Sequence, residues 1–149
     1  MAMQRRLATV DRLARWGIQV NQSCVLCGGD IEEIHDHLYF ECPYSQSLWT
    51  GIQEWLRYKR KIEEWEIEVQ WLTTSVNNRN PKKTLLGVVF AAVVYNIWME
   101  RNERRFQGQR REVQDRAKEI ARQVHISGQK NCKWTPILNT LNSYPTCNP

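Results

Sequence analysis

Apolar residues recur at helical spacing through the most hydrophobic part of the chain, residues 81–106. They fall in two adjacent columns at i, i+4 spacing, which predicts a helix whose apolar face forms the centre of the core. Asn80 is suited to cap this helix, and Pro81 is suited to be its first residue. The columns consist of Leu85, Leu86, Val89, Phe90, Val93, Val94, Ile97 and Trp98.

Three other segments also have helical periodicity. A short helix is expected to follow Thr9 as its cap, with Asp11 in the first turn and Gly17 as the stop signal. A second helix is expected to begin at Pro43, and a third, amphipathic helix to follow Gly108. Their apolar positions are Val10, Leu13 and Trp16, then Tyr44, Leu48, Ile52, Trp55 and Leu56, then Val113, Ala117, Ile120, Ala121 and Val124.

The segment from residue 64 to residue 71 has an ambiguous pattern. Apolar and polar side chains alternate along it, as they do in a strand, but its glutamate content favours a helix, so both interpretations stay open. A turn-rich loop is expected at residues 74–81. The alternating residues are Trp65, Ile67, Val69 and Trp71 on one side and Glu64, Glu66, Glu68 and Gln70 on the other.

Composition limits the class of protein. A chain of 149 residues with 42% apolar and 25% charged residues has the size and composition of one globular domain. The five cysteines are an odd number, and no secretory signal is recognisable, so we expect reduced thiols and a nuclear or cytoplasmic location. The apolar run from Leu85 to Met99 is shorter than the ~20 residues that cross a bilayer. We therefore expect a buried helix and no membrane partner.

The net charge of +5 is unevenly distributed. Residues 1–20 carry four arginines and one aspartate, whereas residues 21–56 carry six acids and no lysine or arginine. Basic residues are again in excess in residues 57–83 and 84–149. An acidic segment therefore lies between basic flanks, a distribution that bears on the partner of the protein.

The acidic segment contains a cluster of metal-ligand residue types. Cys24 and Cys27 are separated by two residues, so a tight turn can direct both thiolates at one ion, and Gly28 and Gly29 relax the backbone after the turn. A histidine and Cys42 complete a set of four N and S ligands, which is typical of a closed, structural zinc site. Zinc binding would contribute folding free energy to this segment.

Two histidines compete for the remaining ligand position. His37 gives gaps of nine and four residues to the flanking cysteines, and His35 gives gaps of seven and six. The four-residue gap is more compact, so the spacing favours His37 and leaves His35 as the alternative. Buried thiols with exposed histidines and no metal are a further alternative. Cys132, Cys147 and His125 have no partner at ligand spacing and are expected to be ordinary side chains.

Together these patterns predict a mainly α, small single domain of about four to five helices with a zinc-stapled loop near the amino terminus. Residues 1–128 are expected to form this zinc-binding helical domain, with the zinc loop at residues 24–42. Residues 129–149 contain Pro136, Pro145 and Pro149 and are expected to form an irregular tail.

Four segments, RLATVDRLARWG, CVLC, HDHLYFECPYSQSLW and VVYNIWMERNERRF, carry a family resemblance. In this order they resemble the zinc-binding region toward the carboxyl end of reverse transcriptases of plant LINE-type (non-LTR) retrotransposons, over roughly residues 4–125. In that family the ligand histidine precedes a Leu-aromatic-aromatic run, which here falls on His37. The resemblance thus implies one structural Zn²⁺ held by Cys24, Cys27, His37 and Cys42.

The chain also departs from that family. A Trp-rich and Phe-rich helical segment usually precedes this region, so we expect part of the usual packing partner to be missing. The polymerase motif Tyr-x-Asp-Asp is absent, and no Gly-x-Ser-x-Gly or Gly-x-x-x-x-Gly-Lys occurs. The acids near the cysteines are expected to be solvated. We therefore expect descent from a retrotransposon reverse transcriptase polyprotein without enzymatic activity.

The basic flanks and the resemblance predict that the protein binds nucleic acid, RNA or DNA, since arginine forks bind phosphates. The competing interpretation is a solvated helix face in which arginines pair with glutamates, for example Glu100 with Arg104. A further alternative is a protein-interaction or self-associating module, or a remnant without a selected role. The predicted contacts are Arg101, Arg104, Arg105, Arg110 and Arg111.

Overall fold

The computed structural model describes residues 2–75, 79–141 and 144–148, and within them the protein is mainly helical. Irregular helical turns at His37–Glu41 and Glu103–Gln107 add to the helices. Across the described residues, the only pairing of extended segments is an antiparallel bridge between Ser23 and Glu32. The predicted fold class is therefore confirmed. The helices are α1 (Val10–Arg15), α2 (Pro43–Trp55), α3 (Trp65–Ser75), α4 (Pro81–Asn102), α5 (Val113–Gly128) and α6 (Thr135–Asn139).

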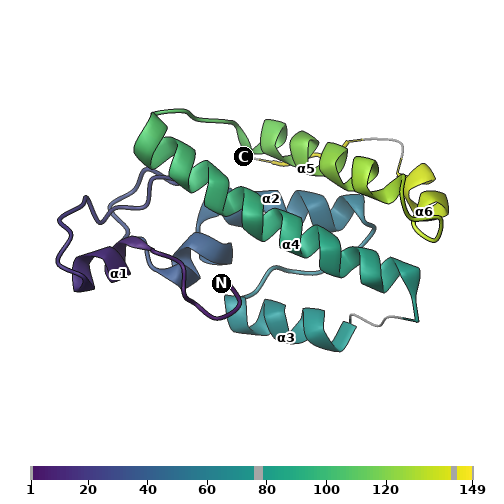
Figure 1. The fold of residues 1–149 in the computed structure, drawn as a ribbon, viewed down its shortest axis with the longest axis horizontal. Helices are drawn as coiled ribbons and strands as arrows, with labels where there is room; N and C mark the ends of the chain where they lie inside the picture. The colour runs from purple at the N-terminus through teal and green to yellow at the C-terminus, as the bar shows by residue number, and fades with distance from the viewer. Residues whose placement is uncertain (1, 76–78, 142–143, 149) are drawn as a thin grey trace.

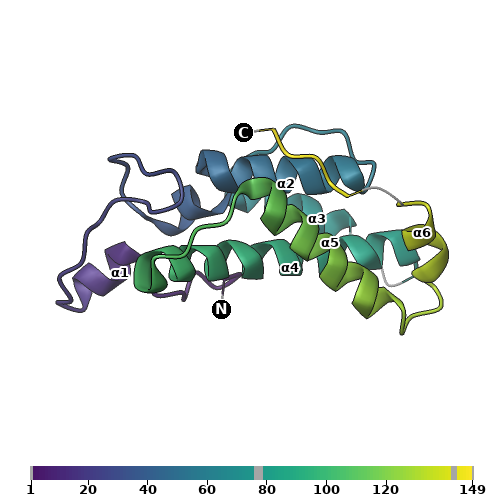
Figure 2. The same ribbon diagram turned by 90° about the horizontal axis from the view of Figure 1, so that it is seen from above.

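Helix α4 is the central element of the molecule. Figure 1 shows it crossing the middle, with α5 above it and α3 below it. Figure 2, turned by 90°, shows that α2 lies behind α4 in the first view and that α5 crosses close to both. The zinc loop and α1 lie together at one end of the molecule, and α6 lies at the other.

An aromatic cluster joins four elements in the core. The ring of Phe40 lies 5.8 to 6.1 Å from the rings of Trp49, Trp65 and Phe90, which come from α2, α3 and α4. Aromatic rings at these separations attract one another and bury a large apolar area. Because Phe40 lies within the zinc loop, two residues before Cys42, this cluster fixes the loop's carboxyl end to the helical core.

The helix boundaries follow the expected signals closely. Asn80 caps α4, because its side-chain oxygen accepts hydrogen bonds from the N–H groups of Lys82 and Lys83. Pro43 is the first residue of α2, and Gly17 ends α1 with a φ of 78°. Thr9 precedes α1 as expected, but its hydroxyl donates to Asp11 Oδ1 at 2.5 Å instead of capping a backbone N–H.

The ambiguous segment is helical. Trp65, Glu68 and Leu72 form the buried face of α3, at the spacing of a helix, while Ile67 is 46% exposed. The buried Glu68 accepts hydrogen bonds from Trp49 Nε1 at 2.8 Å and Arg60 Nη1 at 2.6 Å. The helical period was not recognisable in the sequence because Glu68 occupies a buried position on this face, where the periodicity of a helix leads one to expect an apolar residue.

The carboxyl-terminal tail differs from the expectation in part. Thr135–Asn139 forms α6, and Leu138 and Leu141 are buried. The tail then returns to α5, where Gln114 Nε2 donates to the carbonyl of Pro145 at 2.6 Å. The tail is therefore packed on the domain. The loop expected at residues 74–81 falls partly on residues 76–78, which lie outside the described residues.

The continuous helical segment Pro81–Gln107 is long and apolar enough, by length and composition alone, to cross a membrane. In the structure one face of α4 is buried against other helices, including Leu86, Val89, Val93 and Ile97, none of which is exposed to solvent. This is the packing expected of the core helix of a folded domain.

Candidate metal centre

The first two cysteines lie on a tight turn. The N–H of Gly28 donates to the carbonyl of Cys24 at 3.1 Å, and Gly28 has a φ of 67°, a conformation that favours glycine. The N–H groups of Leu26 and Cys27 point at Cys24 Sγ. The turn therefore directs both cysteine side chains to one side and already offers hydrogen bonds to a thiolate.

A short hairpin supports this turn. The antiparallel bridge between Ser23 and Glu32 brings the outgoing and returning segments together. The N–H of Cys24 donates to the carbonyl of Ile31, and the N–H of Glu33 donates to that of Gln22, both at 2.8 Å. The backbone of the loop is thus ordered by its own hydrogen bonds close to the ligands.

The other two ligands lie at the ends of the turn His37–Glu41. Phe40 has a φ of 80°, the left-handed conformation that costs a residue with a side chain about 1–3 kcal/mol. The N–H of Cys42 donates to the carbonyl of His37 at 2.7 Å. The packing of the Phe40 ring offsets this strain, and the reversed chain brings His37 and Cys42 to the same point.

The donor atoms of Cys24, Cys27, His37 and Cys42 all lie within 4.8 Å of one another. The Sγ atoms of Cys24 and Cys42 are 3.9 Å apart, and Cys27 Sγ is 3.5 Å from His37 Nε2. A tetrahedral ion with zinc bond lengths places two sulfurs about 3.8 Å apart, and sulfur and nitrogen about 3.5 Å apart. The four donors therefore fit one structural zinc ion, as predicted.

His35 is not part of this cluster. Its ring is packed against those of Tyr39 and Trp65, with centroids 4.9 and 4.7 Å away. Its Nε2 lies 3.1 Å from the carbonyl of Ala2, and its Nδ1 lies 3.3 Å from Asp36 Oδ1. The structure therefore places His37, and not His35, beside the three cysteine thiols.

The thiols of Cys24 and Cys42 are joined by a hydrogen bond between their sulfurs. The hydrogen bond from Cys42 lowers the pKa of Cys24 to about 5, and the N–H groups of Cys27 and Leu26 act in the same direction against the effect of burial. The same hydrogen bond and burial raise the pKa of Cys42. Zinc binding must therefore displace a proton from this pair.

The first third of the chain matches a known family. Residues 1–49 match the family described as zinc-binding in reverse transcriptase. The match contains α1, the whole zinc loop and all four ligands. The resemblance seen in the sequence is thereby confirmed at the level of a zinc-binding region of reverse transcriptase. Comparisons with curated proteins and with solved structures gave no match.

Three of the five arginines expected to bind nucleic acid are instead engaged inside the protein. Arg101 is 1% exposed and pairs with the buried Glu33 at 2.7 Å. Arg105 pairs with the other oxygen of Glu33 at 2.9 Å, and Arg104 pairs with the buried Glu100 at 2.6 Å. These ion pairs correct the expectation that the three guanidinium groups face solvent.

Arginines 110 and 111 lie in the connection before α5 and are exposed. The side chain of Arg111 is 45% exposed, and its Nε lies 3.9 Å from Glu103 Oε2. Its backbone N–H donates to Glu100 Oε1 at 2.9 Å, so the main chain of this residue also belongs to the internal network. Of the predicted set, Arg110 and Arg111 therefore present their side chains to solvent.

The residues that complete the network were not predicted from the sequence. Glu33 accepts from the Arg101 and Arg105 side chains and from the Val10 N–H, so it links α1, the zinc loop and α4. Arg116 of α5 donates to Glu100 and to Glu103, both at 2.5 Å. The i, i+4 spacing of Glu100 and Arg104 was a local signal for that pair, whereas the arginine partners of Glu33 are 68 and 72 residues away.

Proposed function

We propose that the protein is a non-catalytic zinc-binding module that binds nucleic acid, RNA or DNA, in the nucleus or cytoplasm. The match to a zinc-binding region of reverse transcriptase supports this, because that enzyme acts on nucleic acid and this region is not its catalytic part. The finer origin that we propose is a LINE-type retrotransposon of a plant. The net charge of +5 favours a polyanionic partner.

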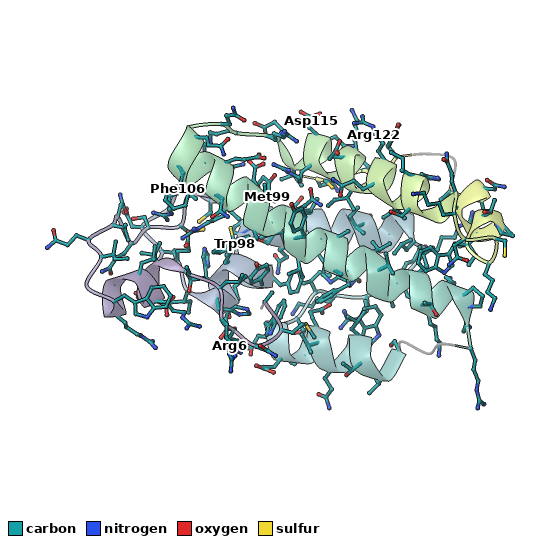
Figure 3. All side chains as sticks on the ribbon, in the orientation of Figure 1. Arg6, Trp98, Met99, Phe106, Asp115 and Arg122 are labelled. Carbon is teal, nitrogen blue, oxygen red and sulfur yellow. The ribbon has the colours of Figure 1, made fainter. Side chains whose placement is uncertain are left out.

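The observation that carries the proposal is an exposed basic and aromatic surface on and around α1, inside the matched region. Trp16 is 57% exposed, and the Arg12 guanidinium lies 5.4 Å from the centre of its ring. Arg15 is exposed on the same helix, and the exposed Arg6 precedes α1 in the sequence and lies at the lower edge of the molecule in Figure 3. Guanidinium groups bind phosphates, and an exposed indole ring stacks on an unpaired base.

A polar cleft of about 500 Å³ continues this surface toward the zinc loop. Its lining includes Arg12 and Arg15 from α1 and Asp36 from the loop. Arg5 donates to Asp36 at 2.9 Å and to Glu66 at 2.6 Å, so this arginine is already paired. On the α1 side, Arg12 and Arg15 face one acid, Asp11, which lies 3.6 Å from Arg15. The excess positive charge therefore lies on this side of the cleft, which we propose as the path of the phosphate backbone.

Fluorescence anisotropy tests this proposal. Zinc-loaded protein is titrated into labelled single-stranded RNA, single-stranded DNA and duplex DNA over a series of salt concentrations. We expect binding that weakens linearly on a log–log salt plot. The double substitution Arg6→Glu and Arg15→Glu should weaken nucleic-acid binding by about tenfold or more, because it removes two phosphate contacts. Each lost contact should also reduce the slope of the salt plot by about one.

The matched control makes the same charge change at Lys59→Glu and Lys61→Glu, two exposed lysines in the connection between α2 and α3. A smaller loss in this control supports a contact surface on α1. Equal losses would contradict that surface, because they would reflect net charge alone. Absence of binding at low salt, by protein shown to be folded, would contradict nucleic-acid binding itself.

A second candidate function is self-association through α4. One observation favours it: an apolar cleft of about 450 Å³ is lined by α4, α3 and the amino-terminal segment, with contributions from Trp98, Val94 and Leu72. Tyr95 on its rim is 58% exposed. Light scattering should show a dimer at micromolar concentration that Tyr95→Glu converts to a monomer. A monomeric parent protein would contradict this candidate.

A further inference from the structure

Arg104 lies between the two halves of the zinc site. Its Nη1 donates to the carbonyl of Leu26 at 2.9 Å and to that of Val25 at 3.3 Å, the two residues between the first pair of cysteines. Its guanidinium also lies 4.6 Å from the centre of the Tyr44 ring. The backbone N–H of Tyr44 in turn faces Cys42 Sγ. One side chain thus contacts the Cys24–Cys27 turn and the start of α2.

The position of this guanidinium is fixed by groups outside the zinc loop. Arg104 Nε donates to Glu100 Oε1 at 2.6 Å, and Nη2 donates to the carbonyl of Arg111 at 3.0 Å. Glu100 is itself held by Arg116 of α5. The Arg104 side chain is only 8% exposed. The helical core therefore holds the guanidinium in place from the side opposite to the loop.

We propose that Arg104 is a positioning residue that sets the zinc affinity of the protein, by holding the Cys24–Cys27 turn against the amino-terminal end of α2. A tetrahedral ion needs all four donors at once, so any motion of the Cys24–Cys27 turn relative to the end of α2 must be lost when zinc binds. A scaffold that already fixes their separation removes that cost and tightens binding. Substituting residues that orient the ligands without touching the metal typically changes metal affinity about 10–100-fold.

Arg105 supports the base of the same loop. Its Nη1 donates to the carbonyl of Asn21 at 2.9 Å, and its Nη2 donates to the carbonyl of Ser23 at 3.0 Å and to Glu33 Oε2 at 2.9 Å. These acceptors lie on both segments of the hairpin that carries Cys24. Two consecutive arginines after α4 thus hold the tip and the base of the hairpin, and the one at the tip is closest to the ligand turn.

The test compares Arg104→Gln with Arg122→Gln in the full chain. Arg122 is 59% exposed on α5 and pairs with Glu119, so the control makes the same chemical change away from the zinc loop. Zinc affinity is measured by competition with a chromophoric chelator. We expect Arg104→Gln to bind zinc about 10–100-fold more weakly than the parent protein. Arg122→Gln should stay within about twofold of the parent, because its surroundings are solvent-exposed. Equal affinities of the two variants would overturn the proposal.

A second measurement separates positioning from a general loss of stability. Urea denaturation is followed by circular dichroism for zinc-free and zinc-loaded samples of each variant. A purely structural role would lower both denaturation midpoints equally. The proposal requires a larger drop in the zinc-loaded sample, because zinc then stabilises the variant less than the parent. Equal drops would overturn it.

Arg104→Lys keeps the test decisive if Arg104→Gln does not fold. A lysine retains the charge opposite Glu100 but cannot reproduce the planar fork that reaches four acceptors. We expect a zinc affinity below that of the parent protein and above that of Arg104→Gln. The absorption of the Co²⁺-substituted Arg104→Lys protein should still be that of a tetrahedral S₃N site. Parent-level affinity in this folded variant would overturn the proposal.

Discussion

Two groups of arginines flank the zinc loop, and they differ in what surrounds them. One group is buried at the end of α4 and the start of α5, and each of its members meets a buried carboxylate: Arg101, Arg104, Arg105 and Arg116. Those around α1 are solvent-exposed; the side chain of Arg15 is 78% exposed and lies 3.6 Å from Asp11. The two groups look alike in the sequence. A high density of arginines in the sequence is therefore not sufficient to locate a nucleic-acid-binding surface.

The physical reason lies in desolvation. A buried guanidinium is stable only when a carboxylate and further acceptors replace its water, so the buried group is committed to internal partners. An exposed guanidinium keeps its water and gains little from a nearby acid, so it remains available to an external phosphate. Substitutions in the two groups should therefore change different quantities.

The largest effect on stability is expected from Glu33→Gln. This substitution removes the negative charge that both Arg101 and Arg105 face in the interior. Uncompensated buried charges should lower the free energy of unfolding by about 3–5 kcal/mol. Urea denaturation of zinc-loaded protein measures the change. Glu32→Gln, one residue away and exposed, serves as control, and a similar loss in both variants would contradict the special role of Glu33.

A smaller effect, with a distinct pH dependence, is expected from Glu100→Gln. Arg116 keeps Glu103 as a partner in this variant, so the loss at pH 7 should be about 1.5–3 kcal/mol. Burial raises the pKa of Glu100, but the Arg111 N–H and the guanidiniums of Arg104 and Arg116 outweigh it and lower the pKa below its ordinary value.

The sign of the pH dependence follows from that lowered pKa. The contribution of the Glu100 carboxylate is complete above the pKa of the unfolded chain, about 4.3, and is lost as the pH falls through the lower folded value. Below pH 4 the difference in unfolding free energy between parent and Glu100→Gln should therefore shrink. Denaturation at a series of pH values checks this, and a difference that stays constant down to pH 3 would contradict it.

The smallest effect on stability is expected from Arg15→Gln in the exposed group. Its ion pair with Asp11 is open to solvent, so the free energy of unfolding should change by less than about 0.5 kcal/mol. Nucleic-acid affinity should nevertheless fall, and the salt slope should decrease by about one. An unfolding loss comparable to that of Glu33→Gln would remove the distinction between the two groups.

The zinc site could be predicted because its information is local. All four ligands lie within nineteen residues, and the spacing of Cys24, Cys27 and Cys42 reflects what a tight turn and one ion require. The helix beginning at Pro81 was equally predictable, since Asn80 and the apolar columns after it act within a few turns. Predictions from local sequence of this kind hold in the folded protein when no contact with a distant residue opposes them.

The roles of the arginines could not be predicted because they depend on residues far along the chain. Arg104 and its acceptor Leu26 are 78 residues apart, and nothing near either one shows the contact. The buried position of Glu68 in α3 likewise involves a partner outside its own helix, Trp49, which is 19 residues away. Helix α6 spans only Thr135–Asn139, too short for a periodic pattern to form.

The distance along the chain between the zinc ligands and Arg104 also orders events during protein synthesis. The turn that Arg104 contacts is made 78 residues earlier, which at a typical rate of about 5–20 residues per second is roughly 4–16 seconds. A nascent chain thus displays its metal-binding cysteines for seconds before the arginine that steadies them has been translated. The protein then reaches its full zinc affinity late, once the turn Glu103–Gln107, which carries Arg104, has left the ribosome.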